Sequence, residues 1–136
     1  MSLNVKTDGP IDVVDVTDQV ASAVPAVEAG VCTVFVNHTT AAVSINEAEP
    51  RLIDDIEQFV GELSAPDGWE HDALDGNADA HLRSSLLGRS VSVPVRDGAL
   101  ALGTWQSVLL IECDGPRDRS LSVTVVPGVA HGRVGF

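Results

Sequence analysis

Three of the four histidines stand in polar corners of the chain, where the side chains of a site can converge. His38 follows an apolar run, His71 lies in a long polar stretch, and His81 begins a short helical pattern. Neutral imidazole is the commonest metal ligand, and three imidazoles around one divalent ion leave an open position for water or substrate. The spacing matches no standard zinc motif, so helix capping, backbone hydrogen bonding or solvent exposure explains these residues equally well. His131, among small residues near the C-terminal end, is expected to lie outside any site.

Most of the 20 acidic residues must be solvated surface groups, because charged side chains are almost never fully buried without a partner. Glu47, beside Asn46 at an expected strand end, and Asp55, in the helix that follows, are stronger candidates because they lie near His38 in sequence. Such carboxylates orient a ligand histidine or bind the ion themselves. The acids expected to be solvated are Asp12, Asp15, Asp18, Asp67 and Asp72.

Two arginines, Arg117 and Arg119, flank a turn and offer planar guanidinium groups suited to phosphate. A solvated hairpin end explains them equally well. Other site types are excluded by their sequence requirements. Ala80 stands where an EF-hand needs glycine, and the chain contains neither a Gly-Lys phosphate loop nor a Gly-x-Ser-x-Gly elbow.

The charge balance excludes nucleic acid as a partner. The chain of 136 residues has 20 acidic and 8 basic residues, for a net charge of -12, and no basic cluster. Such an acid excess, with Lys6 as the single lysine, is typical of proteins that stay soluble in high salt, so we expect a halophilic protein. No apolar stretch approaches the roughly 20 residues that span a bilayer, and the first residues do not resemble a secretory signal. We therefore expect a cytoplasmic protein without membrane contact, with Cys32 and Cys113 as small buried side chains.

The elements that must position these residues can be read from hydrophobic periodicity. Apolar side chains recur every three or four residues over 50–63 and over 78–87, which predicts two helices, the first opened by Pro50 and the second closed by Gly88. A helix from Thr17 or Asp18 to Gly30 is also expected, although Pro25 would shorten it. Strands are expected over 11–16, 31–36, 41–45, 91–95, 100–113 and 121–125, with the last three as an antiparallel meander.

Two further features follow from this reading. The stretch 64–79 is longer than an ordinary connection, and long ordered loops are often functional. Trp105 falls inside the expected strand 100–113, where a lone tryptophan is usually a core residue. Strands outnumber helices and do not alternate with them, which predicts an α+β fold with a mostly antiparallel sheet.

Together these segments resemble the YjbQ-like family, which is described as a family of secondary thiamine-phosphate synthases. The matching blocks occur in the family's order over roughly residues 30 to 126, and they are specific as a set rather than singly. They comprise His38-Thr39-Thr40-Ala41, Ile45-Asn46-Glu47, His71 through Asn77 to His81-Leu82, Ser84-Ser85-Leu86-Leu87-Gly88 with Pro94, and Gly98, Leu100 and Leu102-Gly103-Thr104-Trp105-Gln106 with Glu112 and Asp114-Gly115-Pro116-Arg117.

The resemblance implies one domain over residues 1–136, a mostly antiparallel β-sandwich with two to three helices, assembled as a homotrimer. It also implies a divalent metal, with zinc as the first candidate and iron, nickel and manganese left open. The metal ligands would be His38, His71 and His81, the catalytic group Asn46, Glu47 and Asp55, and the substrate-binding group Thr39, Thr40, Asn77, Arg117 and Arg119.

The implied activity is weak, metal-assisted thiamine-phosphate synthesis, in which a pyrimidine-methyl diphosphate is joined to a thiazole phosphate with loss of pyrophosphate. The reaction would make the protein a transferase whose partner is a phosphorylated small molecule. Two alternatives remain open. One is a metal-dependent binding module for a phosphorylated metabolite without a committed reaction, and the other is a structural trimer that the metal merely stabilises.

Overall fold

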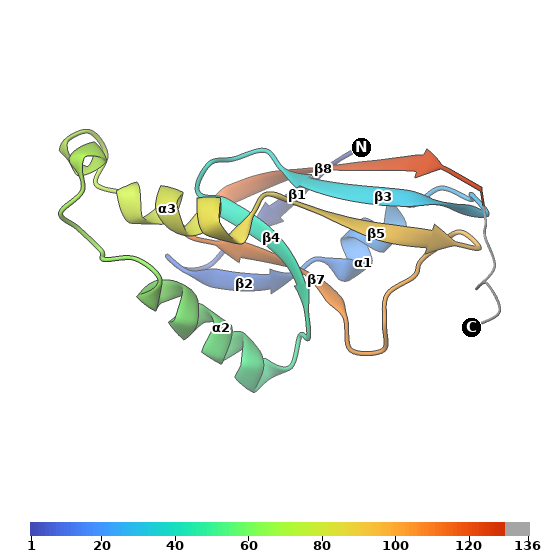
Figure 1. The fold of residues 1–136 in the computed structure, drawn as a ribbon, viewed down its shortest axis with the longest axis horizontal. Helices are drawn as coiled ribbons and strands as arrows, with labels where there is room; N and C mark the ends of the chain where they lie inside the picture. The colour runs from blue at the N-terminus through green and yellow to red at the C-terminus, as the bar shows by residue number, and fades with distance from the viewer. Residues whose placement is uncertain (130–136) are drawn as a thin grey trace.

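Two antiparallel sheets pack face to face in the computed structural model, which describes residues 1–129 (Figure 1). His131 therefore lies outside the described residues. The larger sheet has the order β1 (Ser2–Lys6), β8 (Asp118–Pro127), β3 (Ala29–Val36), β5 (Ser90–Arg96) and β6 (Ala99–Leu100). The smaller sheet has the order β2 (Asp12–Asp15), β7 (Ser107–Glu112) and β4 (Ala41–Asn46). The helices are α1 (Thr17–Ser22), α2 (Pro50–Glu62), the 3-10 turn η1 (Glu70–Ala73) and α3 (Ala78–Leu87).

The core consists of two apolar layers, one on each face of the smaller sheet. Between the sheets, alternate residues of β3 and β8 such as Val34 and Leu121 meet Val43 and Leu110 of the smaller sheet. The opposite face of the smaller sheet packs against α2 and α3 through Ala42, Leu109, Ile111, Val60 and Ala80. The arrangement confirms the predicted α+β sandwich, with α2 and α3 as a third layer (Figure 1).

Helices α2 and α3 begin and end where the sequence predicts. Pro50 occupies the first turn of α2, and the carboxylate of Glu49 accepts a hydrogen bond of 2.8 Å from the Leu52 amide. The α3 helix spans the predicted 78–87 and stops at Gly88, whose φ of 94° suits glycine alone. Local signals were sufficient here because each cap lies within a few residues of the groups that it satisfies.

Arg83 joins the two helices beneath the surface. Its Nε donates to the Val60 carbonyl at 3.0 Å, and its Nη2 donates to the carbonyls of Gly61 and Ser64 at 2.9 and 3.0 Å. Its Nη1 pairs with Asp79 at 2.5 Å. The last carbonyls of a helix have no partner within the helix, so this buried guanidinium satisfies the end of α2 from α3.

The first predicted helix is wrong in its extent. It ends at Ser22 rather than Gly30, since Pro25 has no amide to continue the helix and residues 29–30 already belong to β3. Neither predicted cap is used: the residue preceding α1 is Val16, and Thr17 instead accepts a hydrogen bond of 2.8 Å from the Val108 amide.

The predicted strand 100–113 is also wrong, because it is two short strands separated by a loop. β6 ends at Leu100, β7 begins at Ser107, and the Gln106 side chain accepts a hydrogen bond from the Gly103 amide in the loop between them. Trp105 is 72% exposed in this loop and is not a core residue. The predicted meander fails for the same reason, since β7 crosses to the smaller sheet while β8 lies between β1 and β3 of the larger one.

Both cysteines are free thiols buried in the apolar layers, as predicted. Burial raises the pKa of the Cys113 thiol to about 12, and it also raises the pKa of Cys32, so both side chains are neutral and apolar. Within residues 1–129, no helix is long and apolar enough to cross a membrane.

Candidate functional site

A polar pocket of about 760 Å³ lies at the end of the sandwich where β3 passes into β4 and β8 begins (left in Figure 1). We call it the end pocket. Three separate segments form its walls: the connection from β3 to β4, the start of α3 with the loop before it, and the turn from β7 to β8. Its lining residues are Asn37, His38, Thr39, Thr40, Asp75, Asn77, His81, Asp114, Pro116, Arg117, Asp118 and Arg119.

The connection from β3 to β4 is held in place through its backbone. Arg89 donates to the carbonyls of His38 and Thr39 at 3.0 and 3.1 Å, and the Ser84 hydroxyl also donates to the Thr39 carbonyl at 2.6 Å. Ser84 belongs to α3 and Arg89 follows this helix. The helix therefore connects its own wall of the pocket to the wall formed by the connection from β3 to β4.

A buried ion pair forms the floor of the end pocket. Glu112 is fully buried and Arg119 is 2% exposed, because strand alternation points both side chains into the layer between the sheets. The Glu112 carboxylate accepts hydrogen bonds from Arg119 and from the Thr7 hydroxyl at 2.7 Å. The same guanidinium donates to the Thr40 side chain at 2.8 Å. Within residues 1–129, the Arg119 Nη1 atom has no hydrogen-bond partner.

These contacts keep Glu112 ionised. Burial alone would raise the pKa of its carboxyl group, but hydrogen bonds from Arg119, the Asp114 amide and Thr7 outweigh burial and hold the pKa below its ordinary value. Gly115 passes close to Glu112, where a Cβ atom would stand 2.7 Å from the Glu112 Cγ. Only a residue without a side chain fits at this position.

Asp114 links two of the predicted substrate-binding residues across the pocket. Its Oδ2 accepts hydrogen bonds of 2.9 Å from both the Asn77 Nδ2 and the Arg117 Nη2. The Arg117 side chain is about half exposed, and its Nη1 has no partner among the described residues. Asp114 thus turns two flexible side chains toward one wall of the pocket.

His71 and His81 lie together, with their ring centroids 4.9 Å apart in an edge-to-face contact. In the part of the chain that the structure describes, two buried side-chain atoms have no hydrogen-bond partner, the His71 Nε2 and the Asn77 Oδ1, and the Asp75 carboxylate stands 3.8 Å from that Nε2. Imidazole, amide and carboxylate are chemically suitable donors for a divalent ion. Even so, among residues 1–129 no three His, Cys, Asp or Glu side chains are arranged to hold a metal ion.

His38 lines the end pocket together with His81, whereas His71 is not one of its lining residues. The His38 Nε2 accepts a hydrogen bond of 2.8 Å from the Ser120 amide of β8. A backbone amide only donates, so this nitrogen carries no proton and its lone pair is occupied. The described chain therefore brings together two of the three predicted metal ligands and leaves the third bound to the backbone.

The predicted catalytic group lies away from the end pocket. Asn46 is the last residue of β4 and Thr40 immediately precedes the strand, so the two lie about 20 Å apart at the usual rise of a strand. Glu47 lines a small surface hollow with Trp105 instead, and Asp55 is exposed on α2. Proximity along the sequence does not bring these residues to the end pocket within one chain, because an extended strand carries successive residues apart.

Comparisons with known proteins identify the family and match the fold. A family model described as UPF0047 protein YjbQ-like matches residues 1–128. The chain belongs to this family. A UPF0047 protein of Archaeoglobus fulgidus is 48% identical over 124 residues, covering 90% of this chain and 98% of the relative. The crystal structure of a hypothetical protein from Aeropyrum pernix K1 has a TM-score of 0.90 and 44% identity, covering 94% of this chain and 98% of that one.

A further relative is the UPF0047 protein YugU of Bacillus subtilis, 34% identical over 131 residues, covering 92% of this chain and 97% of YugU. The names of these three relatives state no activity. Membership of the YjbQ-like family thus confirms the resemblance seen in the sequence and leaves the chemistry to be argued from the pocket.

Three residues that shape the end pocket received no site role from the sequence: Glu112 and Asp114, which were quoted only within the family blocks, and Arg89. The strongest signal was Glu112, a single charge that ends the otherwise apolar run 108–111. A charged residue inside a buried strand requires a buried partner, and strand alternation would have suggested Arg119. Asp114 and Arg89 act through contacts with distant segments, for which the sequence carries no comparable signal.

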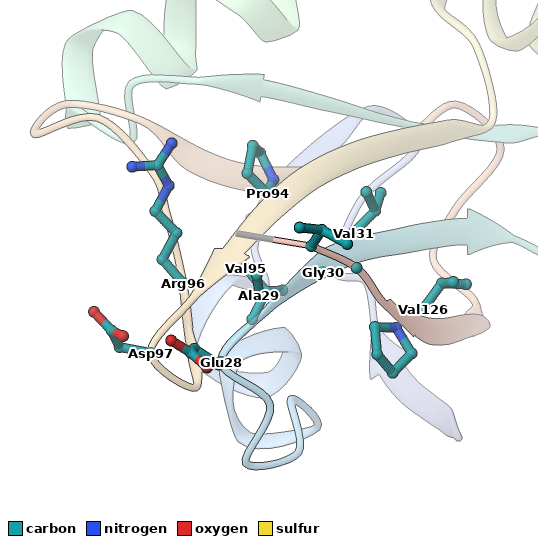
Figure 2. Close-up of a pocket in the computed structure, with 12 residues that line it drawn as sticks. Glu28, Ala29, Gly30, Val31, Pro94, Val95, Arg96, Asp97 and Val126 are labelled. Carbon is teal, nitrogen blue, oxygen red and sulfur yellow. The ribbon is translucent and has the colours of Figure 1, made fainter. Parts of the chain in front are cut away.

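A second pocket, of about 500 Å³, opens at the opposite end of the larger sheet (Figure 2). Its walls are mainly apolar and backbone atoms from β3, β5 and β8, including Val31, Pro94 and Val126. Charged groups occur at its rim, where Glu28, Arg96 and Asp97 stand at strand ends. It contains no histidine or cysteine among its lining residues, so the end pocket remains the candidate site.

Proposed function

We propose that this YjbQ-like protein binds a phosphorylated small molecule in the end pocket, with the phosphate against Arg117 and Arg119. The observation that carries the proposal is the state of the two guanidinium groups. Each is fixed on one side by a carboxylate and has an Nη1 without a partner among the described residues, in a protein with a net charge of -12. Planar guanidinium groups held in this way are well suited to phosphate oxygens.

We further propose a divalent metal beside the phosphate, with zinc as the first candidate. His81 and Asp75 line the end pocket, and the ring of His71, whose Nε2 has no partner among the described residues, contacts the ring of His81. These observations support this position. Bound there, the metal would neutralise charge on the phosphorylated ligand. The remaining coordination positions are left to Asp75, to water and to the ligand.

The reaction proposed for this pocket is thiamine-phosphate synthesis. The ring nitrogen of the thiazole phosphate forms a bond to the methylene carbon of the pyrimidine, while the carbon-oxygen bond to the diphosphate breaks and pyrophosphate leaves with the electron pair. Arg117 and Arg119 would bind the departing pyrophosphate, and Asn77 would orient the ligand at the opposite wall. Fixed cationic donors stabilise the negative charge that develops on the leaving pyrophosphate.

The proposed function is tested by calorimetric titration of pyrophosphate and by an assay of pyrophosphate release from the two substrates. The Arg117→Ala variant should bind pyrophosphate at least 10-fold more weakly, a loss that matches a charge-assisted hydrogen bond of roughly 1.5 kcal/mol. Arg96→Ala is the matched control, since it removes an exposed arginine at the other end of the sandwich.

Two outcomes would redirect the proposal. Saturable pyrophosphate binding without product under any divalent metal would favour a binding module without a committed reaction. No binding at all, together with a melting temperature that falls when the metal is stripped, would favour a structural trimer stabilised by the metal.

We also propose a homotrimer, in which a neighbouring subunit brings the catalytic group to the end pocket. Large apolar side chains support an association, since Leu74, Leu86 and Trp105 are each at least 70% exposed. Glu47 stands beside Trp105, so burial of this region against a second subunit would place it in an interface. Mixing inactive Arg117→Ala and Glu47→Ala proteins should restore pyrophosphate release if two subunits share one site, and a mixture that stays inactive would contradict the sharing.

A further inference from the structure

The His38 ring is held in place by a hydrogen bond from the larger sheet. The Ser120 amide donates to its Nε2 at 2.8 Å, and Arg89 holds the His38 carbonyl at 3.0 Å. Ser120 belongs to β8, which lies between β1 and β3 of the larger sheet, and the ring lines the end pocket. The side chain is therefore held in one orientation with its remaining edge available to a ligand.

This contact determines the tautomer of the imidazole. An unprotonated Nε2 means that the neutral ring carries its proton on Nδ1. Burial is the largest cause that lowers the pKa of His38, Arg119 and Arg117 lower it further, and Glu112 opposes them. The neutral ring is thus the favoured form, with one occupied lone pair and one N–H group.

Such a ring cannot bind a metal without losing an existing contact. Coordination requires a free lone pair on Nε2 or Nδ1, and the first is used by Ser120 while the second is protonated. If the proton moved to Nε2, it would face the N–H group of Ser120 and the hydrogen bond would be lost. The Nδ1–H group, by contrast, is ready to donate to an acceptor.

We propose that His38 is a neutral hydrogen-bond donor, through Nδ1–H, to a phosphate oxygen of the ligand in the end pocket, and is not a metal ligand. The inference rests on the proposed phosphate binding and adds the residue that recognises the oxygen. Arg117 and Arg119 line the same pocket and supply charge, whereas His38 supplies a fixed direction without adding charge. The ligand class is a phosphate or diphosphate ester.

Two variants separate the roles of the two ring nitrogens. In His38→Asn, the amide nitrogen reaches the place of Nδ1 and preserves a donor there. In His38→Gln, the amide reaches the place of Nε2 and preserves a partner for the Ser120 amide. If His38 only accepts the hydrogen bond from Ser120, His38→Gln should retain pyrophosphate binding better than His38→Asn. If His38 donates to the phosphate, His38→Asn should retain it better.

The experiment titrates pyrophosphate into the wild-type protein and both variants, measures their metal content by elemental analysis, and assigns the wild-type tautomer from long-range proton-nitrogen correlation spectra. We expect His38→Asn to bind within a few-fold of wild type, His38→Gln to bind at least 10-fold more weakly, and both to keep the wild-type metal content. The spectrum needs no substitution and should show the proton on Nδ1.

The outcomes distinguish this inference from the proposed function. Equal weakening in both variants, loss of metal from His38→Asn, or a proton on Nε2 in the wild type would overturn the donor role while wild-type pyrophosphate binding stands. A wild-type protein that binds neither pyrophosphate nor inorganic phosphate would instead overturn the proposed function, and the ligand assigned to His38 with it.

Discussion

At the scale of single residues, the Glu112–Arg119 pair is the feature on which the pocket depends. Both side chains are buried, and they connect three segments through Thr7, Thr40 and the turn from β7 to β8. A buried ion pair adds little net stability by itself, but removing one partner leaves the other charge buried and unpaired. The pair therefore serves mainly to orient Arg119. Loss of either partner should strongly destabilise the fold.

The Glu112→Gln variant should be strongly destabilised. The substitution keeps the shape of the side chain but leaves the Arg119 guanidinium without a countercharge, so we expect a loss on the order of 3–5 kcal/mol in the free energy of unfolding. Urea denaturation measures it. Glu62→Gln, on the exposed face of α2, is the matched control and should change the free energy by less than about 0.5 kcal/mol. A comparable loss in both variants would argue against a special role for the buried pair.

The stability of the wild-type protein should also depend on Glu112 at acid pH. Because the folded-state pKa of this carboxyl group lies below its ordinary value of about 4.5, its ionisation stabilises the fold above that pH, and the contribution is lost as the pH falls through the folded pKa. The difference in unfolding free energy between wild type and Glu112→Gln should therefore shrink as urea denaturation is repeated from about pH 7 to about pH 3. A difference that stays constant over this range would contradict the assignment.

At the scale of elements, the helical layer is attached to the pocket through α3. This helix contributes His81 to the lining and Ser84 to the connection between β3 and β4, and Arg83 ties it to the end of α2. The loop between the two helices includes η1 and carries His71. The position of His81 thus depends on how α3 docks, whereas His71 is positioned by η1 in the loop.

Replacing Arg83 with methionine should loosen this attachment. The variant fills the apolar part of the side-chain volume but leaves three carbonyls and Asp79 without their partner, so we expect a loss of roughly 3 kcal/mol in stability. Hydrogen exchange should rise first at the end of α2 and in the loop that carries His71. Arg51→Met, which removes an exposed ion pair with Glu49, is the control and should have an effect below about 1 kcal/mol. Uniform exchange across the protein would mean that Arg83 supports the fold as a whole.

At the scale of the whole molecule, the net charge of -12 is the dominant feature. Self-repulsion among exposed carboxylates destabilises the compact state, and salt screens it over a Debye length of about 10 Å at 0.1 M. The end pocket is lined by two arginines, Arg117 and Arg119, and by three aspartates, Asp75, Asp114 and Asp118. If the arginines bind phosphate as proposed, salt should weaken that binding while it stabilises the fold.

The expected response is a free energy of unfolding that rises steeply from about 0.1 M to about 2 M potassium chloride, while pyrophosphate binding weakens over the same range. Urea denaturation and calorimetric titration at each salt concentration measure the two effects. A flat stability curve would remove the halophilic interpretation of the composition, and binding that does not weaken with salt would speak against arginines as the phosphate-binding groups.

The sequence by itself determined the features that are encoded locally. The limits of α2 and α3, the burial of both cysteines and the family could all be predicted from it. Each depends on groups a few residues apart, or on a set of short blocks in a fixed order. Periodicity and capping residues are sufficient for such features because helices and turns satisfy their hydrogen bonds within themselves.

Only the tertiary structure decided which of these blocks meet. It placed Glu112 against Arg119, moved Asn46 and Glu47 to the far end of β4, exposed Trp105, and occupied His38 with the backbone of β8. These relations depend on the pairing of strands such as β3 and β8, whose residues lie more than 80 positions apart. Strand register and the packing of the two sheets set them, and hydrophobic periodicity carries no information about which strand becomes the neighbour of which.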